Sequence, residues 1–498
     1  MKLNHIIKAS SFILGAFLLY SCNDFLDEVP DNRVALDNLD KSAQLVTNAY
    51  SLASPAFTDW MSDDVDWTNG TVIRPSHLQT FQWEDVTADP TEQDTPIFFW
   101  FQTYDAIAHA NEVLAVIDEL PALTDDDEAR RDAIKGEALL ARAYGHFMLV
   151  NLFGEHYSQQ SASSDLGVPY VETPETTFIA TYKRASVKRV YDKVEDDLLE
   201  GLDLIDDSFY ANSGKYHFNR NAALAFASRF YLFKGDMVRC VDYSSQLLGG
   251  DPGAFVRDLT SQEFLLASSS IQGYPQLYSS PDQPSNLMLM RKISLVQRPD
   301  FAFGPLSNFY GSLFATRPFV NTTDSRENPA FVKGDNALFP VRYENLFERS
   351  SLNSNTGLPY HIAIAFRGEE VLLNRAEAYM IQGKLDESIA DLQILTDRRY
   401  SGASHVLTKD LLRQFYGAEN EPSFTDQLIL LNYILLERRK EFISQGMRWF
   451  DIKRYGIAVN HTLQDGQTVI TLQQNDLRKV LQIPKTAIDV GGLKPNPR

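Results

Sequence analysis

The stretch from Arg367 to Arg399 constrains the fold more than any other part of the chain. Its apolar residues follow the period of an α-helix, pause at Gly383 and then resume. This pattern predicts two antiparallel helices joined by a tight turn. A single hairpin of this kind cannot bury its own apolar face, so further helical pairs are expected to stack against it.

The same hairpin matches the spacing of a tetratricopeptide repeat. The matching residues are Ala376, Ala378, Tyr379, Gly383, Leu385 and Leu392. Ser388 stands where that repeat usually has alanine, which is a mild departure. Amphipathic helical spacing also appears in segments 39–53, 98–120, 131–153, 187–205, 221–248 and 428–455. The sequence therefore predicts several stacked helical pairs.

The first 21 residues have the layout of an export signal. Lys2 and Lys8 are followed by an apolar run, 12–19, which is too short to span a bilayer as a stable helix. The next residues, Leu-Tyr-Ser-Cys ending at Cys22, resemble a bacterial lipobox. We expect 1–21 to be removed, Cys22 to carry acyl chains that anchor the protein stably, and 22–36 to act as a tether. An ordinary signal peptide with a chance cysteine is the alternative.

Two other segments have the composition of loops but an unusual aromatic content. Residues 55–97 hold three tryptophans among prolines and acidic residues. Residues 249–360 are rich in Gly, Pro, Ser, Asn and single aromatics, and one strand-like run, 287–290, interrupts them. Because long structureless loops are uncommon in a compact domain, these segments favour a functional surface over an idle linker.

This mixture of side chains is typical of sugar-binding sites. A pyranose has apolar C–H faces that stack on aromatic rings, and its hydroxyl groups bind carboxylates and amides. The candidate ligand-binding residues are Trp60, Trp67, Trp83, Asp64, Asp66, Asn69, Tyr274, Tyr278 and Asn286. The competing interpretation is core packing, because a chain with 31 Phe and 22 Tyr buries most of its aromatic side chains. Trp100 and Trp449 follow helical stripes and are expected to pack.

Charge and motif content exclude several classes of function. A formal net charge of −20 argues against a nucleic-acid partner. The nine histidines show no zinc spacing, and no nucleophile motif or phosphate loop is present, so an enzyme is not expected. The acidic cluster Asp63, Asp64 and Asp66 could hold a calcium ion, but its spacing matches no complete calcium loop. No cofactor is therefore predicted. Cys240 is expected to be a small buried side chain.

Several motifs together resemble the SusD/RagB family of Bacteroidetes. The similar segments are 434–442 (ILLERRKEF), 448–456 (RWFDIKRYG), 136–144 (GEALLARAY), 184–187 (RASV), 375–378 (RAEA) and 483–484 (IP), and Gly446 also matches. They occur in the right order over nearly the whole chain behind the signal. Phe442 and Gln445 depart from the leucine and glutamate more usual there.

The resemblance implies an all-α-dominated fold with little strand. About four tetratricopeptide-like helix pairs would form a right-handed superhelical scaffold, covered by a loop-rich region. Residues 37–260 and 361–498 would be the N- and C-terminal helical regions, and 261–360 the insert that carries the ligand face. The whole of 22–498 would then be one globular unit.

The resemblance also implies a function. The protein would be an outer membrane lipoprotein, lipid-anchored and facing the cell exterior, that binds an oligosaccharide or polysaccharide. It would deliver this ligand, uncleaved, to a SusC-like TonB-dependent transporter. A peptide-binding member of the same family and a non-catalytic protein-docking scaffold remain the alternatives.

Overall fold

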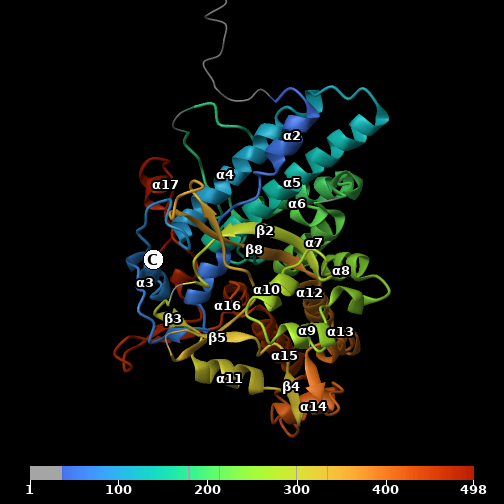
Figure 1. The fold of residues 1–498 in the computed structure, drawn as a ribbon, viewed down its shortest axis with the longest axis vertical. Coiled ribbons are helices and arrows are strands. Elements are labelled where there is room, and N and C mark those ends of the chain that lie inside the picture. The colour runs from blue at the N-terminus through green and yellow to red at the C-terminus, as the bar shows by residue number, and fades with distance from the viewer. Residues whose placement is uncertain (1–35, 178–179, 212, 299, 334) are drawn as a thin grey trace, which may run out of the picture. The chain divides into compact units, whose positions relative to one another are not determined.

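In the computed structural model, which describes residues 36–177, 180–211, 213–298, 300–333 and 335–498, helices dominate and strands are short (Figure 1). This confirms the predicted helical fold class. Cys22, the predicted signal peptide and the tether up to residue 35 lie outside the described residues. Among the described residues, no helix is both long and apolar enough to cross a membrane.

The predicted hairpin is present as α12 (Gly368–Ile381) and α13 (Leu385–Asp397). Gly383 closes α12 with φ of +78°, a left-handed conformation that glycine adopts without steric cost. Ser388 fits its unusual position because its hydroxyl donates a hydrogen bond to the Ala376 carbonyl at 2.8 Å. The first helix is buried along most of its length, so it forms the centre of the C-terminal half.

The other long helices pack on this hairpin or on one another. They are α4 (Pro96–Leu114), α5 (Asp125–Phe153), α6 (Val187–Leu204), α7 (Arg220–Lys234), α8 (Met237–Leu248) and α15 (Asp426–Phe442). α5 packs between α4 and α6, α7 packs on α8, and α12 contacts α7, α8 and α15. Gly136 explains part of one motif: a Cβ there would lie 3.0 Å from the Gly201 carbonyl oxygen, so glycine lets α5 and α6 approach closely.

The first predicted helix is shorter than expected. α2 (Leu39–Val46) ends well before residue 53, because Tyr50 leaves the helical path. Its hydroxyl donates a hydrogen bond to Glu137 on α5 and accepts one from the Phe218 amide at 2.9 Å. Pro55 follows soon afterwards, and a proline also disfavours continuation of a helix.

The loop-rich segment contains more strand than the sequence indicates. The predicted run 287–290 lies within β2 (Asn286–Ile293), which pairs with β8 (Gly357–Arg367), and β7 (Leu346–Arg349) completes an antiparallel sheet of order β2-β8-β7. Short two-stranded pairs join β1 (Asp66–Trp67) to β3 (Phe303–Gly304), β4 (Thr322–Asp324) to β9 (Tyr400–Gly402), β5 (Ala330–Lys333) to β6 (Ala337–Pro340) and β10 (Val459–Thr462) to β11 (Val469–Leu472).

Short helices fill the remaining connections. They are α3 (Pro75–Phe81), α9 (Gln262–Ala267), α10 (Gly273–Tyr278), α11 (Ser307–Ala315), α14 (Lys409–Phe415), α16 (Arg448–Tyr455) and α17 (Lys485–Asp489). The charged residues Arg438 and Glu441 on α15 form buried ion pairs between elements, as predicted from the sequence. Arg438 pairs with Asp451 on α16 at 3.0 Å, and Glu441 pairs with Arg399 at 2.9 Å, all in the interior. Trp100, Trp449 and Cys240 are buried, as predicted.

Candidate functional site

The aromatic content of residues 55–97 mostly builds core. A 3₁₀ helix, Pro55–Met61, is capped by Ser54 and buries its apolar side chains. Trp60 on it is only 2% exposed, with its ring centroid 4.4 Å from that of His77 and 5.1 Å from that of Phe301. A ring enclosed in this way cannot stack on a sugar, so the structure assigns Trp60 to packing.

Trp83 is also enclosed. It is 3% exposed, and its indole nitrogen donates a hydrogen bond to the Met61 carbonyl at 2.9 Å. Its ring stacks on His461 at 4.4 Å, His461 stacks on Phe81 at 4.3 Å, and Phe81 stacks on Phe303 at 4.5 Å. The four stacked rings form a rigid support that joins residues 81–83 to strands β3 and β10.

Asp63 and Asp64 of the acidic cluster that follows Trp60 are paired with arginines. Arg448 binds both carboxylate oxygens of Asp63, at 2.8 and 2.9 Å, and Arg439 binds Asp64. Burial raises the pKa of Asp63, but the two arginines outweigh it and the net shift is downward. In the described part of the chain, no group of three or more His, Cys, Asp or Glu side chains is placed to hold a metal ion.

The second predicted group lies inside the protein as well. Tyr274, Tyr278 and Asn286 are each no more than 2% exposed. The Asn286 side chain donates a hydrogen bond to the Tyr278 carbonyl at 2.9 Å, and the Arg257 guanidinium lies 3.9 Å from the Tyr278 ring centroid. Asp64, Trp60 and Trp83 are buried too, so six of the nine predicted site residues have side chains that are covered by protein in this structure.

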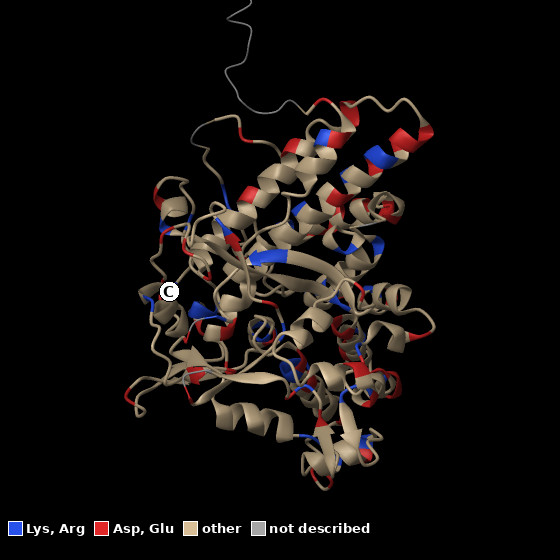
Figure 2. Ribbon diagram, in the orientation of Figure 1, with Lys and Arg blue, Asp and Glu red and all other residues tan. Residues whose placement is uncertain are grey.

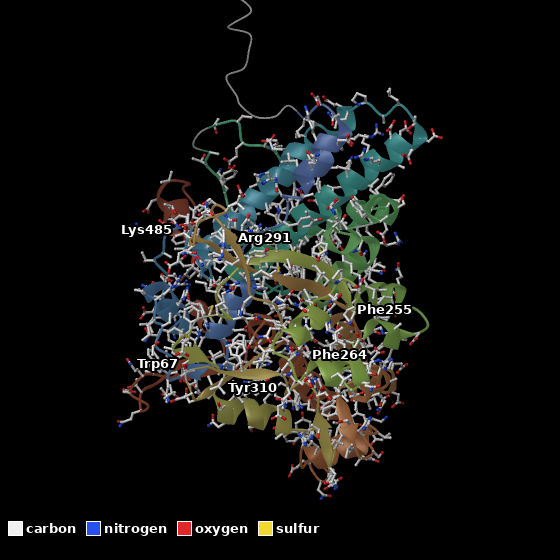
Figure 3. The ribbon with its side chains drawn as sticks, viewed as in Figure 1. Trp67, Phe255, Phe264, Arg291, Tyr310 and Lys485 are labelled. Carbon is white, nitrogen blue, oxygen red and sulfur yellow. The ribbon has the colours of Figure 1, made fainter. Side chains whose placement is uncertain are left out.

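Three of the nine candidates remain accessible and lie together: Asp66, Trp67 and Asn69. Trp67 on β1 pairs with Phe303 on β3 and is half-buried, and its ring is held edge-on by Phe81 and Phe303 at 6.0 and 5.2 Å. It lies at the edge of the molecule, at the lower left of Figure 3. The indole lines a hollow of about 530 Å³.

The rest of the hollow comes from distant segments. Its lining residues are Trp67, Leu78, Gln82, Leu463, Gln464 and Asp465. The last three sit in the turn between β10 and β11, and Asp66 holds this hairpin in place by accepting a hydrogen bond from the Thr462 amide at 2.6 Å. Sequence analysis missed them because a C-terminal turn without aromatic residues gives no signal. The turn reaches Trp67 because strand β10, which precedes the turn, contacts β1 in the folded protein.

Asn69 links the hollow to the loop-rich insert. Its side-chain amide donates a hydrogen bond to Asp335 at 2.6 Å, and its backbone amide donates one to the Asn336 side chain at 2.7 Å. Both partners belong to the turn between β5 and β6. The first loop segment, the insert and the C-terminal hairpin therefore converge around Trp67.

The chemistry of the hollow suits binding. An indole ring and two leucines offer an apolar wall, and two glutamines and an aspartate offer hydrogen-bonding groups. None of these six side chains is a nucleophile paired with a base. A repeat-like helical scaffold with such a surface fits the class of binding proteins.

Comparison with known proteins identifies the family. Residues 24–232 match a family model described as starch-binding associating with outer membrane, and residues 340–489 match the SusD family model. The two matches together cover more than half of the chain, which belongs to the SusD/RagB family.

Relatives and solved structures agree with this assignment. The SusD-like protein P38 of Formosa agariphila is 21% identical over 400 residues, which make up 74% of each chain. A SusD superfamily protein of Bacteroides thetaiotaomicron has a TM-score of 0.66 at 21% identity, covering 93% of this chain and 100% of its own. A laminarin-binding SusD-like protein has a TM-score of 0.59 at 18% identity, covering 92% and 98%. Carbohydrate binding and association with the outer membrane are thus supported at the level of the family.

Proposed function

We propose that this protein is a cell-surface lipoprotein of the outer membrane that captures an oligosaccharide or polysaccharide. Capture takes place at the Trp67 hollow, where the indole stacks on a sugar ring and Asp66, Asn69 and the glutamines bind hydroxyl groups or position the loops. The protein then passes the intact glycan to a SusC-like TonB-dependent transporter. The acylated Cys22 holds it at the membrane.

The observation that supports this proposal most directly is the position of Trp67. It is half-buried and lines an open hollow, whereas Trp60 and Trp83 are only 2% and 3% exposed, and three segments far apart in sequence meet around it. Members of the SusD family bind glycans and pair with SusC transporters in general, which supplies the ligand class and the partner. A pure docking scaffold would have no need of this arrangement.

The test uses protein lacking residues 1–22, run through affinity gels that contain one polysaccharide each. Starch and laminarin come first, followed by other plant, fungal and bacterial polymers and by peptides. Retarded migration on a polysaccharide, with no shortening of the polymer in solution, is the expected result. Retention by peptides alone would favour the peptide-binding alternative, and shortened polymer would contradict a purely binding role.

The anchor is tested separately with the full-length chain. Cells fed a radiolabelled or clickable fatty acid should label the wild-type protein, and the label should be absent from the Cys22→Ser variant. Labelling that persists in this variant would contradict attachment at Cys22. Cys240→Ser serves as the matched control, because that thiol is buried and should not affect labelling.

A further inference from the structure

The Trp67 hollow is bordered by negative charge. Asp465 lines it directly, Asp66 precedes Trp67, and Asp335 binds Asn69 at its other side. In the part of the chain that the structure describes, no lysine or arginine is among its six lining residues. At the lower left of Figure 2, the β10–β11 hairpin carries acidic colour and no basic colour.

Asp465 stays ionised and fixed in place. It accepts hydrogen bonds from the backbone amides of Gln467 and Thr468 at 2.9 and 2.8 Å, and from the Thr468 hydroxyl at 2.5 Å. These contacts, the hydroxyl first, lower its pKa from the ordinary value. The carboxylate therefore presents a full negative charge at neutral pH.

The arginines of the C-terminal motif that contact the loop before Trp67 are already paired with carboxylates. Arg448 is bidentate on Asp63, and Arg439 binds Asp64 and also contacts Asp63 at 3.3 Å. Their donors are directed at these two buried or partly buried carboxylates. Among the six lining side chains an anionic sugar would meet no guanidinium or ammonium group of the kind that carboxylate and sulfate recognition requires.

We infer that the hollow selects neutral glycans and discriminates against glycans that bear carboxylate or sulfate groups. This inference rests on the proposed function and specifies its substrate class. Sugar hydroxyl groups can donate hydrogen bonds to Asp465, Asp66 and the amide oxygens, whereas a sugar carboxylate would be repelled by the same groups. Like-charge repulsion of this kind lowers the affinity for an anionic glycan and so increases the difference in affinity between neutral and anionic glycans.

The experiment compares matched polymers. Laminarin and starch are each tested beside their carboxymethyl derivative, together with alginate and polygalacturonate, by affinity gel and calorimetry. Measurements are made at about 10 mM and about 1 M salt, because exposed charges interact over a Debye length of about 30 Å at the lower concentration and about 3 Å at the higher. We expect the neutral parent to bind at least several-fold more tightly than its derivative at low salt, and the difference to shrink at high salt.

Asp465→Asn tests the residue itself. The asparagine keeps an oxygen for the turn amides but removes the charge, so the preference for the neutral parent should narrow. Asp386→Asn is the control, because Asp386 is an exposed carboxylate on α13, paired with Lys409 at 2.8 Å and away from the hollow. It should leave the preference unchanged.

The outcomes separate the two claims. Equal or tighter binding of an anionic polymer at low salt, with Trp67 required, would overturn the inference of neutral selectivity and leave the proposed function standing. Failure to bind any polysaccharide would overturn the proposed function, and the inference with it. An equal narrowing in Asp386→Asn would show that net charge, and not the hollow, sets the preference.

Discussion

At the scale of single residues, burial decides which aromatic side chains can meet a ligand. Of the three tryptophans that the sequence groups together, Trp60 and Trp83 are almost fully buried against other rings, and Trp67 is half-buried beside an open hollow. Composition cannot separate these roles, because the same residue type serves a core and a sugar site equally well. The separation depends on neighbours such as Phe301 and His461, which lie far away in the sequence.

Trp60→Ala should therefore affect stability far more than Trp67→Ala. Removing a fully buried indole loses its transfer free energy and leaves a cavity, which costs about 3–5 kcal/mol of unfolding free energy. Half-buried Trp67 should cost clearly less. Urea unfolding monitored by circular dichroism measures both variants. Equal losses of stability would contradict the assignment of Trp60 to the core and Trp67 to the surface.

At the scale of elements, most helices were predictable, but of the strands only part of β2 was. The apolar residues of α12 and α13 repeat over short distances in the sequence. The spacing of these residues and the position of Gly383 therefore predict where the two helices begin and end. β8 gives no such signal. One face of β8 lines a cavity and carries small or polar side chains, among them His361, Ala363 and Ala365, so its sequence lacks a hydrophobic alternation. Its partner strand β2 is also far away in the sequence. The turn between β10 and β11 was missed for a similar reason.

The ion pair between Asp63 and Arg448 connects the C-terminal motif to the segment that carries Trp67. Arg448→Met should cost about 2–3 kcal/mol of unfolding free energy, because it removes two charge-assisted hydrogen bonds to a largely buried carboxylate. It should also weaken glycan binding, since the loop before Trp67 loses a fixed point. A double-mutant cycle with Asp63→Asn should give a coupling energy of about 1–3 kcal/mol.

Lys409→Met provides the matched control for this pair. It breaks an exposed ion pair with Asp386, and such pairs contribute about 0–1 kcal/mol. Its effect on stability should be small and glycan binding should not change. Additive energies for Asp63→Asn and Arg448→Met would show that the two side chains do not stabilise each other.

At the scale of the whole molecule, buried histidines make stability depend on pH. Burial lowers the pKa of His77 to about 4 and the pKa values of His146, His156 and His361 to about 3. The unfolded chain takes up these protons near pH 6.5 and the folded protein does not, so stability is present above that pH and is lost as the pH falls. His77 alone accounts for about 3 kcal/mol between pH 6.5 and 4.

Three buried carboxyl groups act in the opposite direction. The pKa values of Asp59, Asp64 and Asp391 are raised, mainly by burial, so these groups favour the folded state as the pH falls. The histidines outweigh them near pH 6, and we expect the urea midpoint to decrease from pH 7 to pH 5. His77→Gln should lessen this decrease. A midpoint that rises over the same range would contradict neutral, buried histidines.

The whole account depends on glycan capture at the Trp67 hollow, and one titration tests this most directly. The polysaccharide that retards wild-type protein in affinity gels is titrated by calorimetry into wild type, Trp67→Ala and Phe347→Ala. Phe347 is an aromatic residue on β7 that is 44% exposed and does not line the hollow, so it controls for loss of a surface ring.

Trp67→Ala should bind at least about five-fold more weakly while it remains folded, because loss of one ring stacked on a ligand costs about 1–3 kcal/mol. Phe347→Ala should bind like wild type. Wild-type affinity in Trp67→Ala, or a loss in Phe347→Ala as large as the loss in Trp67→Ala, would contradict capture at this hollow.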